Sequence, residues 1–203
     1  EGRITTGGSK VFEDRVSPAT ATVAKRLIAA GGILVGKTKT VEVAMGGWGT
    51  NQQMGTPWNP WDLKTHRTPG GSSSGSAVAV ASGMVSCAVG TDTGGSVRGP
   101  SAWCGIVGLK TTEGQIPTDG IIPLSHTLDT AGPMAANVKD AARLLSYMAG
   151  FDPEDPATKA IPKDMPLNFS TNLSKTNLKG KTIGEIKQMD LKKLLELVKL
   201  LGF

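Results

Sequence analysis

The sequence predicts an α/β protein, in which helices alternate with short apolar strands along the chain. Apolar residues recur at helical spacing over 23–28, and Gly31-Gly32 ends that helix. The apolar run 33–35 follows and is expected to be a strand. With 203 residues, the chain is long enough for one domain with a sizeable core.

The elements before residue 72 are expected to be short. Ser17-Pro18 predicts the start of the first helix, with the serine as N-cap and the proline at the first helical position. Thr38 is expected to cap a short helix that runs through Val43. Residues 46–71 are rich in Gly, Asn, Pro and Trp, which predicts a loop.

The middle of the chain is rich in small residues, which favours closely packed elements. Residues 74–83 predict a buried helix and residues 85–89 a buried strand, before a polar, glycine-rich turn over 91–95. A short helix is expected from about Pro100, and a strand over 106–109.

Asn137 predicts the N-cap of an amphipathic helix that Gly150 ends, and the composition changes after that glycine. Residues 1–150 are therefore expected to be a partial domain core, and residues 151–180, rich in Pro, Asp, Asn, Ser and Lys, a surface connection.

Residues 181–203 are expected to be the truncated start of the C-terminal part of the same domain. They include a predicted strand over 181–186 and a predicted amphipathic helix over 191–201.

The net charge of +5 lies entirely in residues 159–203, because basic and acidic residues balance over 1–158. This tail has no interleaved aromatic residues, so a solvated surface is favoured over a site for nucleic acid or anionic lipid. No apolar run approaches the roughly 20 residues that a membrane span needs. We expect a cytoplasmic protein with no direct contact to nucleic acid or membrane.

Two cysteines, Cys87 and Cys104, lie among small apolar residues and are expected to be buried free thiols of a reducing compartment. A disulfide between them is the alternative that the sequence leaves open. With His66 and His126 they complete no zinc pattern. No metal and no cofactor are expected.

Two serine- and glycine-rich segments stand out, over 70–76 and 90–98. A serine nucleophile needs an exposed hydroxyl, a proton acceptor within reach and backbone N–H groups that face the developing oxyanion. Residues 93–96 suit the last need, because successive residues without bulky side chains form a nest of N–H groups. Ser72 lies on the other glycine-rich turn and is a candidate relay.

Other interpretations of these segments fit less well. A phosphate-binding loop requires a lysine after its last glycine, and neither segment has one. The Gly-x-Ser-x-Gly elbow fails because Arg98 stands where the elbow has glycine. His66 and His126 are weak candidates for the base of a Ser-His-Asp triad, and either segment alone would favour a flexible loop.

Together the two segments resemble the signature region of the amidase signature family, nearly residue by residue from Pro69 to Thr111. The second segment reads Gly-Thr-Asp-Thr-Gly-Gly-Ser-Val-Arg-Gly-Pro from residue 90, followed by Gly105, Gly108 and Lys110. The flanking segments 59–62 (Asn-Pro-Trp-Asp) and 128–134 (Leu-Asp-Thr-Ala-Gly-Pro-Met) agree. The resemblance covers essentially the whole chain, weakens after residue 150, and implies a mixed β-sheet core surrounded by α-helices, incomplete in this chain.

The resemblance also implies the roles of individual residues. Ser96 is the expected nucleophile, and Ser72 the expected cis-serine after Gly71. The implied oxyanion hole consists of the main-chain N–H groups of Thr93, Gly94, Gly95 and Ser96. Support of the two turns is implied for Ser73, Asp92 and Arg98. The lining of the acyl site is implied for Met45, Gly46 and Gly47.

The catalytic base that the family resemblance implies is a neutral lysine, which draws the proton of the nucleophile through the cis-serine. Glu1-Gly2-Arg3-Ile4-Thr5-Thr6-Gly7-Gly8-Ser9 matches the stretch that comes after that lysine in the family, so the base is expected before Glu1. Lys10 and Lys37 are not expected to replace it, and Lys110 is expected to be structural. The chain is therefore expected to be a fragment without the N-terminal lysine segment and the C-terminal part, inactive by itself.

The resemblance implies an amidohydrolase that cleaves a linear carboxamide to a carboxylate and an amine or ammonia. Two alternatives stay open: a glutaminase-like A subunit of a tRNA-dependent amidotransferase, and an inactive truncated homologue. The expected partners are a small amide substrate and either a second copy of the chain or the partner subunits of an amidotransferase. Trp48, Trp58 and Trp103 are expected to pack in the core or in loops rather than to shape a pocket.

Overall fold

The computed structural model describes residues 1–162, 164–171, 173 and 180–182. The chain divides into two units, residues 1–171 and residues 172–203. The first unit contains α1 (Thr22–Ala29), α2 (Ser74–Ala81), β1 (Cys87–Asp92), α3 (Arg98–Cys104), β2 (Val107–Gly108), β3 (Thr130–Ala135), α4 (Val138–Met148) and the 3-10 turns η1 (Lys10–Phe12), η2 (Glu42–Ala44) and η3 (Pro156–Ala160).

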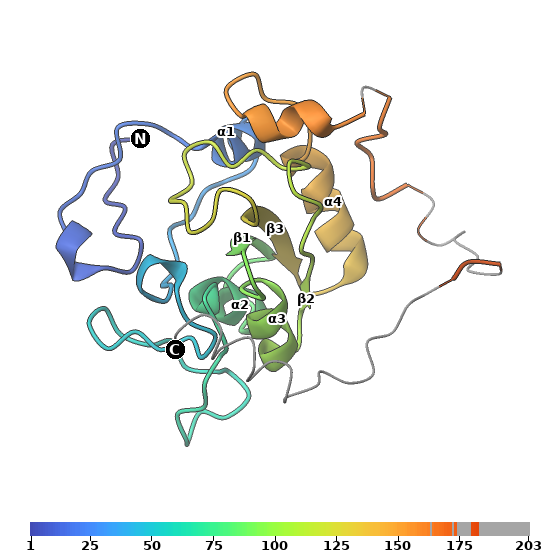
Figure 1. The fold of residues 1–203 in the computed structure, drawn as a ribbon. Coiled ribbons are helices and arrows are strands. Elements are labelled where there is room, and N and C mark those ends of the chain that lie inside the picture. The colour runs from blue at the N-terminus through green and yellow to red at the C-terminus, as the bar shows by residue number, and fades with distance from the viewer. Residues whose placement is uncertain (163, 172, 174–179, 183–203) are drawn as a thin grey trace, which may run out of the picture. The chain divides into compact units, whose positions relative to one another are not determined.

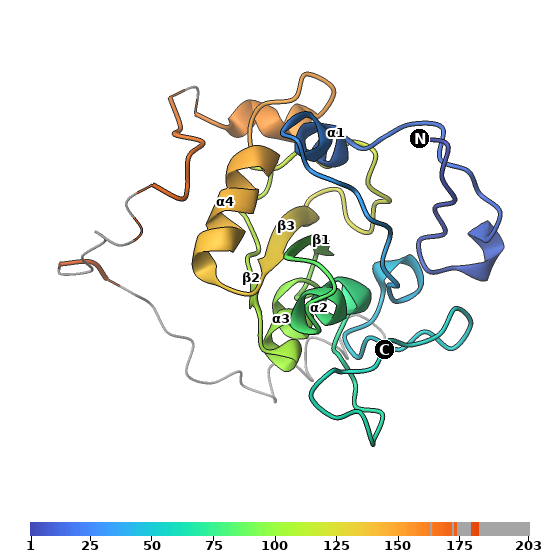
Figure 2. The ribbon, with the colours of Figure 1, turned by 180° about the vertical axis from the view of Figure 1, so that it is seen from behind.

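The three strands form one sheet with β3 in the centre, antiparallel to both β1 and β2. All six residues of β3 are buried. Ala131 packs into a cluster with α1 and α4, whereas Met134 packs into a second cluster with α2 and α3. Because successive side chains of a strand point to opposite faces, the sheet separates two cores. Figures 1 and 2 show α4 along one side of the sheet with α1 beside its C-terminal end.

This arrangement confirms the α/β class, and several elements agree with their sequence patterns. Helix α2 forms as expected, and α4 begins at the predicted cap, where Asn137 Oδ1 accepts from Asp140 N at 2.9 Å. Strand β1 runs on to Asp92, so the glycine-rich turn begins at Thr93 rather than Thr91. Helix α3 begins at Arg98, and β2 is shorter than expected.

The predictions near the N-terminus are partly wrong. The first helix begins at Thr22, because the Ser17 hydroxyl donates to Ala19 O and caps nothing. Residues 33–35 form no strand, and Ile33 is 89% exposed. An apolar run becomes a strand only where a neighbouring backbone can pair with it, and none of the described residues does so.

Two more expectations need correction. The Thr38 hydroxyl bonds to Ser76 Oγ at 2.9 Å instead of capping a helix, and the expected helix is the 3-10 turn η2. Strand β3 was not anticipated, because its sequence, Thr-Ala-Gly-Pro-Met-Ala, has low β propensity. Burial between two layers of helices outweighs that propensity.

The segments after α4 are described only in part. Within the expected surface connection 151–180, Asp152, Asp155 and Thr158 are buried, and Thr118 N donates to Asp155 Oδ2 at 2.7 Å. The strand expected over 181–186 and the helix expected over 191–201 lie outside the described residues, apart from 181 and 182.

Cys87 and Cys104 are both free. Cys104 is fully buried, and burial raises the pKa of its thiol to about 11. Cys87 is only half-buried, which corrects the expectation that both are buried.

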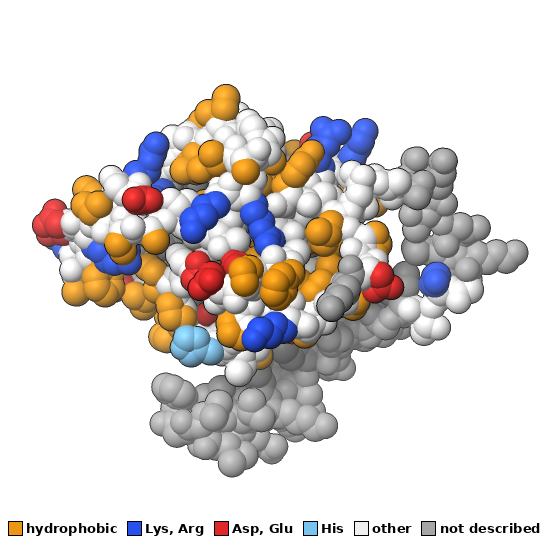
Figure 3. All heavy atoms as spheres, turned by 90° about the horizontal axis from the view of Figure 1, so that it is seen from above, with side chains coloured by type: hydrophobic (Ala, Val, Ile, Leu, Met, Phe, Trp, Pro, Cys, Tyr) orange, Lys and Arg blue, Asp and Glu red, His pale blue; other side chains and the backbone are white. Residues whose placement is uncertain are grey.

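The surface carries many large hydrophobic side chains, which Figure 3 shows on the face seen from above. No helix among the described residues is both apolar enough and long enough to cross a membrane.

Gly90 lies in β1 where the sheet packs closely against the serine turn, the glycine- and serine-rich turn at 70–73. A Cβ at this position would lie 2.7 Å from Met134 Sδ, 2.8 Å from Ser73 Oγ and 2.9 Å from Val97 Cγ2. We expect Gly90→Ala to lower the free energy of unfolding by about 1–3 kcal/mol, because packed cores tolerate added atoms poorly. Gly36→Ala is the matched control, since a Cβ there meets nothing within 4 Å. Equal denaturation midpoints for the two variants would contradict this packing.

Candidate active site

The two serine- and glycine-rich segments lie side by side. The turn at 70–73 leads into α2, and the loop at 93–97 connects β1 to α3. Ser73 joins them: its N–H donates to Ser96 O at 3.2 Å, and its hydroxyl donates to Thr91 O at 3.2 Å. Thr91 N donates back to Ser73 Oγ at 3.1 Å. Ser73 therefore holds the serine turn against both ends of the other segment.

Ser72 is fixed in the centre of this junction. The Gly71–Ser72 peptide is cis, as the family resemblance implied. The Ser72 carbonyl accepts from Val41 N at 3.1 Å and from Thr40 Oγ1 at 2.8 Å. Its side chain is completely buried, and Ser72 Oγ has no hydrogen-bond partner among the described residues. A buried hydroxyl with unused bonding capacity is available to pass a proton.

The segment expected to line the acyl site contacts the serine turn. Gly71 N donates to Gly47 O at 2.7 Å. A Cβ on Gly71 would lie 2.6 Å from Gly46 O, so the backbones of these glycines touch. Met45 adjoins them and is 68% exposed.

Asp92 organises the loop that carries Ser96. Its carboxylate is completely buried and accepts from the main-chain amides of Gly95, Val97 and Arg98 at 2.7, 3.0 and 3.2 Å. The guanidinium of Arg98 adds two more bonds, from Nε and Nη2, each 3.1 Å long. Burial by itself would raise the pKa of Asp92, but the hydrogen bonds from Arg98 and the amides outweigh it and hold the pKa below its ordinary value.

The expected oxyanion donors are not all available. Gly95 N donates to Asp92 Oδ1, so the expectation of a free donor at Gly95 is wrong for this structure: a buried carboxylate already takes that hydrogen. The main-chain amides of Thr93, Gly94 and Ser96 have no hydrogen-bond partner among the residues described. A Cβ on Gly94 or Gly95 would meet nothing within 4 Å, so open space lies in front of this stretch.

Lys37 and Lys110, neither of which is expected to be the base, bond to other groups. Lys37 Nζ donates to Ile4 O at 3.2 Å and also bonds to Thr5 Oγ1. Lys110 pairs with Glu113 at 2.7 Å. Within the described ranges, no lysine ammonium group, that of Lys10 included, hydrogen-bonds to Ser72 or Ser96.

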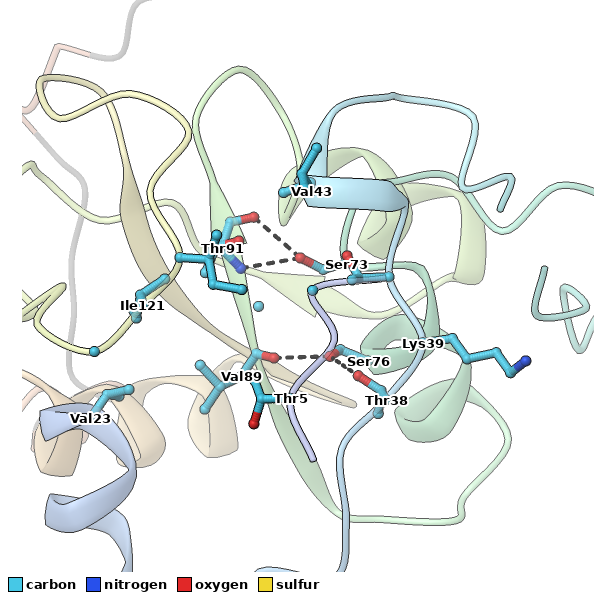
Figure 4. A pocket seen from close by; sticks show the side chains of 16 residues that line it. Thr5, Val23, Thr38, Lys39, Val43, Ser73, Ser76, Val89, Thr91 and Ile121 are labelled. Atoms are coloured by element: carbon cyan, nitrogen blue, oxygen red, sulfur yellow. Dashed lines mark hydrogen bonds between the residues drawn. The ribbon is translucent and has the colours of Figure 1, made fainter. Parts of the chain in front are cut away.

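A cavity of about 280 Å³ lies beside Ser73, next to the pair formed by Ser72 and Ser96 (Figure 4). Ser73 and Thr91 form one wall, and Thr38 and Ser76 add further hydroxyl groups. The side chain of Lys39 points away from the cavity, and its Nζ bonds to Met54 O. Neither Ser72 nor Ser96 lines it, so the cavity adjoins the pair from the side of Ser73.

Both histidines are exposed, and His66 stacks on Trp58 with 4.5 Å between ring centroids. Trp48 and Trp103 pack edge to face at 5.6 Å, in keeping with the loop packing expected of them. Among the described residues, no three His, Cys, Asp or Glu side chains could together hold a metal ion.

The chain is similar to known proteins over most of its length. A family model described as Amidase matches residues 1–199. The chain belongs to the amidase family. A relative from Prochlorococcus marinus, named as the A subunit of glutamyl-tRNA(Gln) amidotransferase, is 45% identical over 188 residues, which are 93% of this chain and 37% of the relative. A protein of the same name from Coxiella burnetii is 47% identical over 180 residues, 89% of this chain and 36% of that protein.

Solved structures of amidases have the same fold. The native peptide amidase from Stenotrophomonas maltophilia is 43% identical with a TM-score of 0.76, over 82% of this chain and 34% of that one. The A subunit of glutamyl-tRNA(Gln) amidotransferase from Thermotoga maritima is 45% identical with a TM-score of 0.72, over 77% and 34% of the two chains. The chain thus spans little more than a third of the length of these proteins.

The structure adds one contact at the serine turn that sequence patterns did not indicate. Thr40 Oγ1 and Val41 N both hold the Ser72 carbonyl. These residues lie more than 30 positions before Ser72 in a stretch without regular pairing, so no periodic pattern connects them with it.

Proposed function

We propose that the complete protein hydrolyses linear carboxamides through an acyl-enzyme on Ser96. The observation that carries this proposal is the junction at Ser73. It holds the buried Ser72 hydroxyl beside the Ser96 loop, and neither that hydroxyl nor the amides of Thr93, Gly94 and Ser96 have a hydrogen-bond partner in the part of the chain that the structure describes. A nucleophile, a relay and a set of N–H donors are the parts that acyl transfer needs.

The reaction proceeds in two halves. The Ser96 hydroxyl attacks the amide carbonyl carbon while its proton passes through Ser72 to a neutral lysine. The amides of Thr93, Gly94 and Ser96 stabilise the oxyanion, and the same relay protonates the departing amine. Water then cleaves the acyl-enzyme to a free carboxylate. Lys37 and Lys110 bond to other groups. We therefore propose that the lysine base belongs to a part of the complete protein that these 203 residues do not include.

A second candidate function is the A subunit of a tRNA-dependent amidotransferase. It is favoured by the relatives of that name, which are 45–47% identical to this chain. In that function, glutamine is the amide and the released ammonia serves a partner protein of the complex.

Ammonia release distinguishes the two functions. The complete protein is assayed with a simple linear carboxamide and with glutamine, alone and with the partner subunits of an amidotransferase. Hydrolysis of the carboxamide by the protein alone supports the amidohydrolase. Ammonia release from glutamine only with partners supports the amidotransferase function, and no release under any condition overturns both.

A further inference from the structure

The register of the sheet places an unassigned carboxylate beside the start of the Ser96 loop. Strands β1 and β3 are antiparallel, with Asp92 opposite Thr130. One step further in the same register sets Thr93 opposite Asp129. The side chains meet there, because the Thr93 hydroxyl donates to Asp129 Oδ1. Thr93 carries the first of the amides assigned to the oxyanion.

The other oxygen of this carboxylate holds a separate turn. Asp129 Oδ2 accepts from Leu124 N at 2.7 Å and from Ser125 N at 2.9 Å. Burial raises the pKa of Asp129, but the bonds from Thr93 and the two amides outweigh it, so the pKa lies below its ordinary value. The group is therefore an ionised acceptor at neutral pH and makes strong hydrogen bonds.

The two carboxylates beside the loop hold different parts of it. Asp92 fixes residues 95, 97 and 98 through their amides and does not bond to Thr93. Within the described residues, Asp129 is the group that holds the Thr93 side chain. This bond ties the Thr93 side chain to Asp129, so it limits how far residue 93 can move together with the N–H group that it carries.

We propose that Asp129 is a positioning residue of the oxyanion site, acting through the Thr93 hydroxyl. This inference rests on the proposed acyl-transfer function. A competing account gives Asp129 a structural role alone, in which it serves the turn at 124–125 and its contact with Thr93 has no consequence for the reaction.

Variants of Thr93 separate the two accounts, because they leave the turn at 124–125 intact. In the complete protein, Thr93→Val removes the donor to Asp129, whereas Thr93→Ser keeps it. We expect Asp129→Asn and Thr93→Val each to lower kcat roughly 10- to 100-fold with little change in KM, since small misplacements of oxyanion donors are costly. Thr93→Ser should retain near wild-type kcat, and the double variant should be no worse than either single variant.

Asp62→Asn is the matched control. Asp62 also accepts from two successive amides, Lys64 N and Thr65 N, both at 3.0 Å, but it lies outside the Ser96 loop. Its kcat should stay at the wild-type value. Wild-type kcat in Thr93→Val together with lowered stability in Asp129→Asn would establish the structural account and overturn the proposal.

A second readout keeps this inference separate from the proposed function. If Ser96→Ala retains activity, the acyl-transfer site is wrong, and the NMR order parameters of the Thr93 and Gly94 amides decide the role of Asp129. We expect these order parameters to fall from a rigid-backbone value of about 0.85 to below about 0.6 in Asp129→Asn and Thr93→Val, and to stay unchanged in Thr93→Ser and Asp62→Asn. Unchanged order parameters in the first two variants would overturn the proposal.

Discussion

Replacement of Ser96 by alanine is expected to lower the amidase activity of the complete protein by roughly 10³-fold or more, because the acyl-enzyme then has no atom on which to form. Stability should hardly change. The contact that Ser96 makes with the serine turn uses its carbonyl, which accepts from Ser73 N and remains in the variant. Hydrolysis rates and denaturation midpoints of the same preparations test both statements.

Ser72→Ala provides a second test of the same pair. Its hydroxyl is buried and without a partner among the described residues, so removing it should cost no stability and can even add some. Activity should nevertheless fall, because the relay to the base is lost. Ser82→Ala is the control, since that hydroxyl donates to two carbonyl groups of α2, Val78 O at 2.7 Å and Ala79 O at 3.4 Å. Full activity in Ser96→Ala would contradict the assignment of the nucleophile.

Asp92→Asn is expected to have the largest effect on stability, with a decrease of about 2–4 kcal/mol in the free energy of unfolding. The amide group offers one acceptor oxygen where the carboxylate offers two, so at least one of the donors at Gly95, Val97 and Arg98 loses its partner. The loop that carries Ser96 is loosened at the same time, so activity should fall with stability.

The environment of Asp92 makes this cost larger than that of an ordinary ion pair. Its side chain is 0% exposed, whereas the side chain of Arg98 is 55% exposed. Arg98→Gln should therefore destabilise less than Asp92→Asn, because the exposed guanidinium gains little in water. Asp62 and Arg67 make the same kind of pair at 3.1 Å with 32% and 65% exposure. Asp62→Asn should leave stability nearly unchanged, and a cost equal to that of Asp92→Asn would contradict the role given to burial.

The same carboxylate predicts how stability depends on pH. The pKa of Asp92 is lower in the folded protein than in the unfolded chain. Its contribution is therefore fully present above about pH 4, the ordinary pKa of an aspartate, and is lost as the pH falls through the lower folded value. Denaturation midpoints measured below pH 4 should fall in the wild type, and should fall less in Asp92→Asn.

The two serine- and glycine-rich turns were predictable because their patterns are local in sequence. Glycines and serines at fixed spacing identify both turns. The hydrogen bonds of Asp92 to Arg98 reach only six residues along the chain. The amphipathic pattern and cap of α4 are local in the same sense. Patterns of this kind depend on neighbours in sequence, so they can be recognised before the fold is known.

Contacts across the sheet were not predictable in this way. Strand β3 contains Gly132 and Pro133, and burial between two helical layers makes it a strand. The contact between Thr93 and Asp129 depends on that strand and on its register. The hydrogen bond from Gly95 N to Asp92 was not predictable for a related reason, because it forms only when the turn folds and brings that N–H to the carboxylate.

In the proposed site, the Ser96 hydroxyl faces a group of amide hydrogens, with the Ser72 hydroxyl beside it. A crystal structure of the complete protein after reaction with a fluorophosphonate would show whether these groups lie together. We predict phosphorus bonded to Ser96 Oγ, with its oxygen roughly 3 Å from the amides of Thr93, Gly94 and Ser96. An adduct on another residue, or a phosphoryl oxygen that faces solvent while those amides bond elsewhere, would contradict the account.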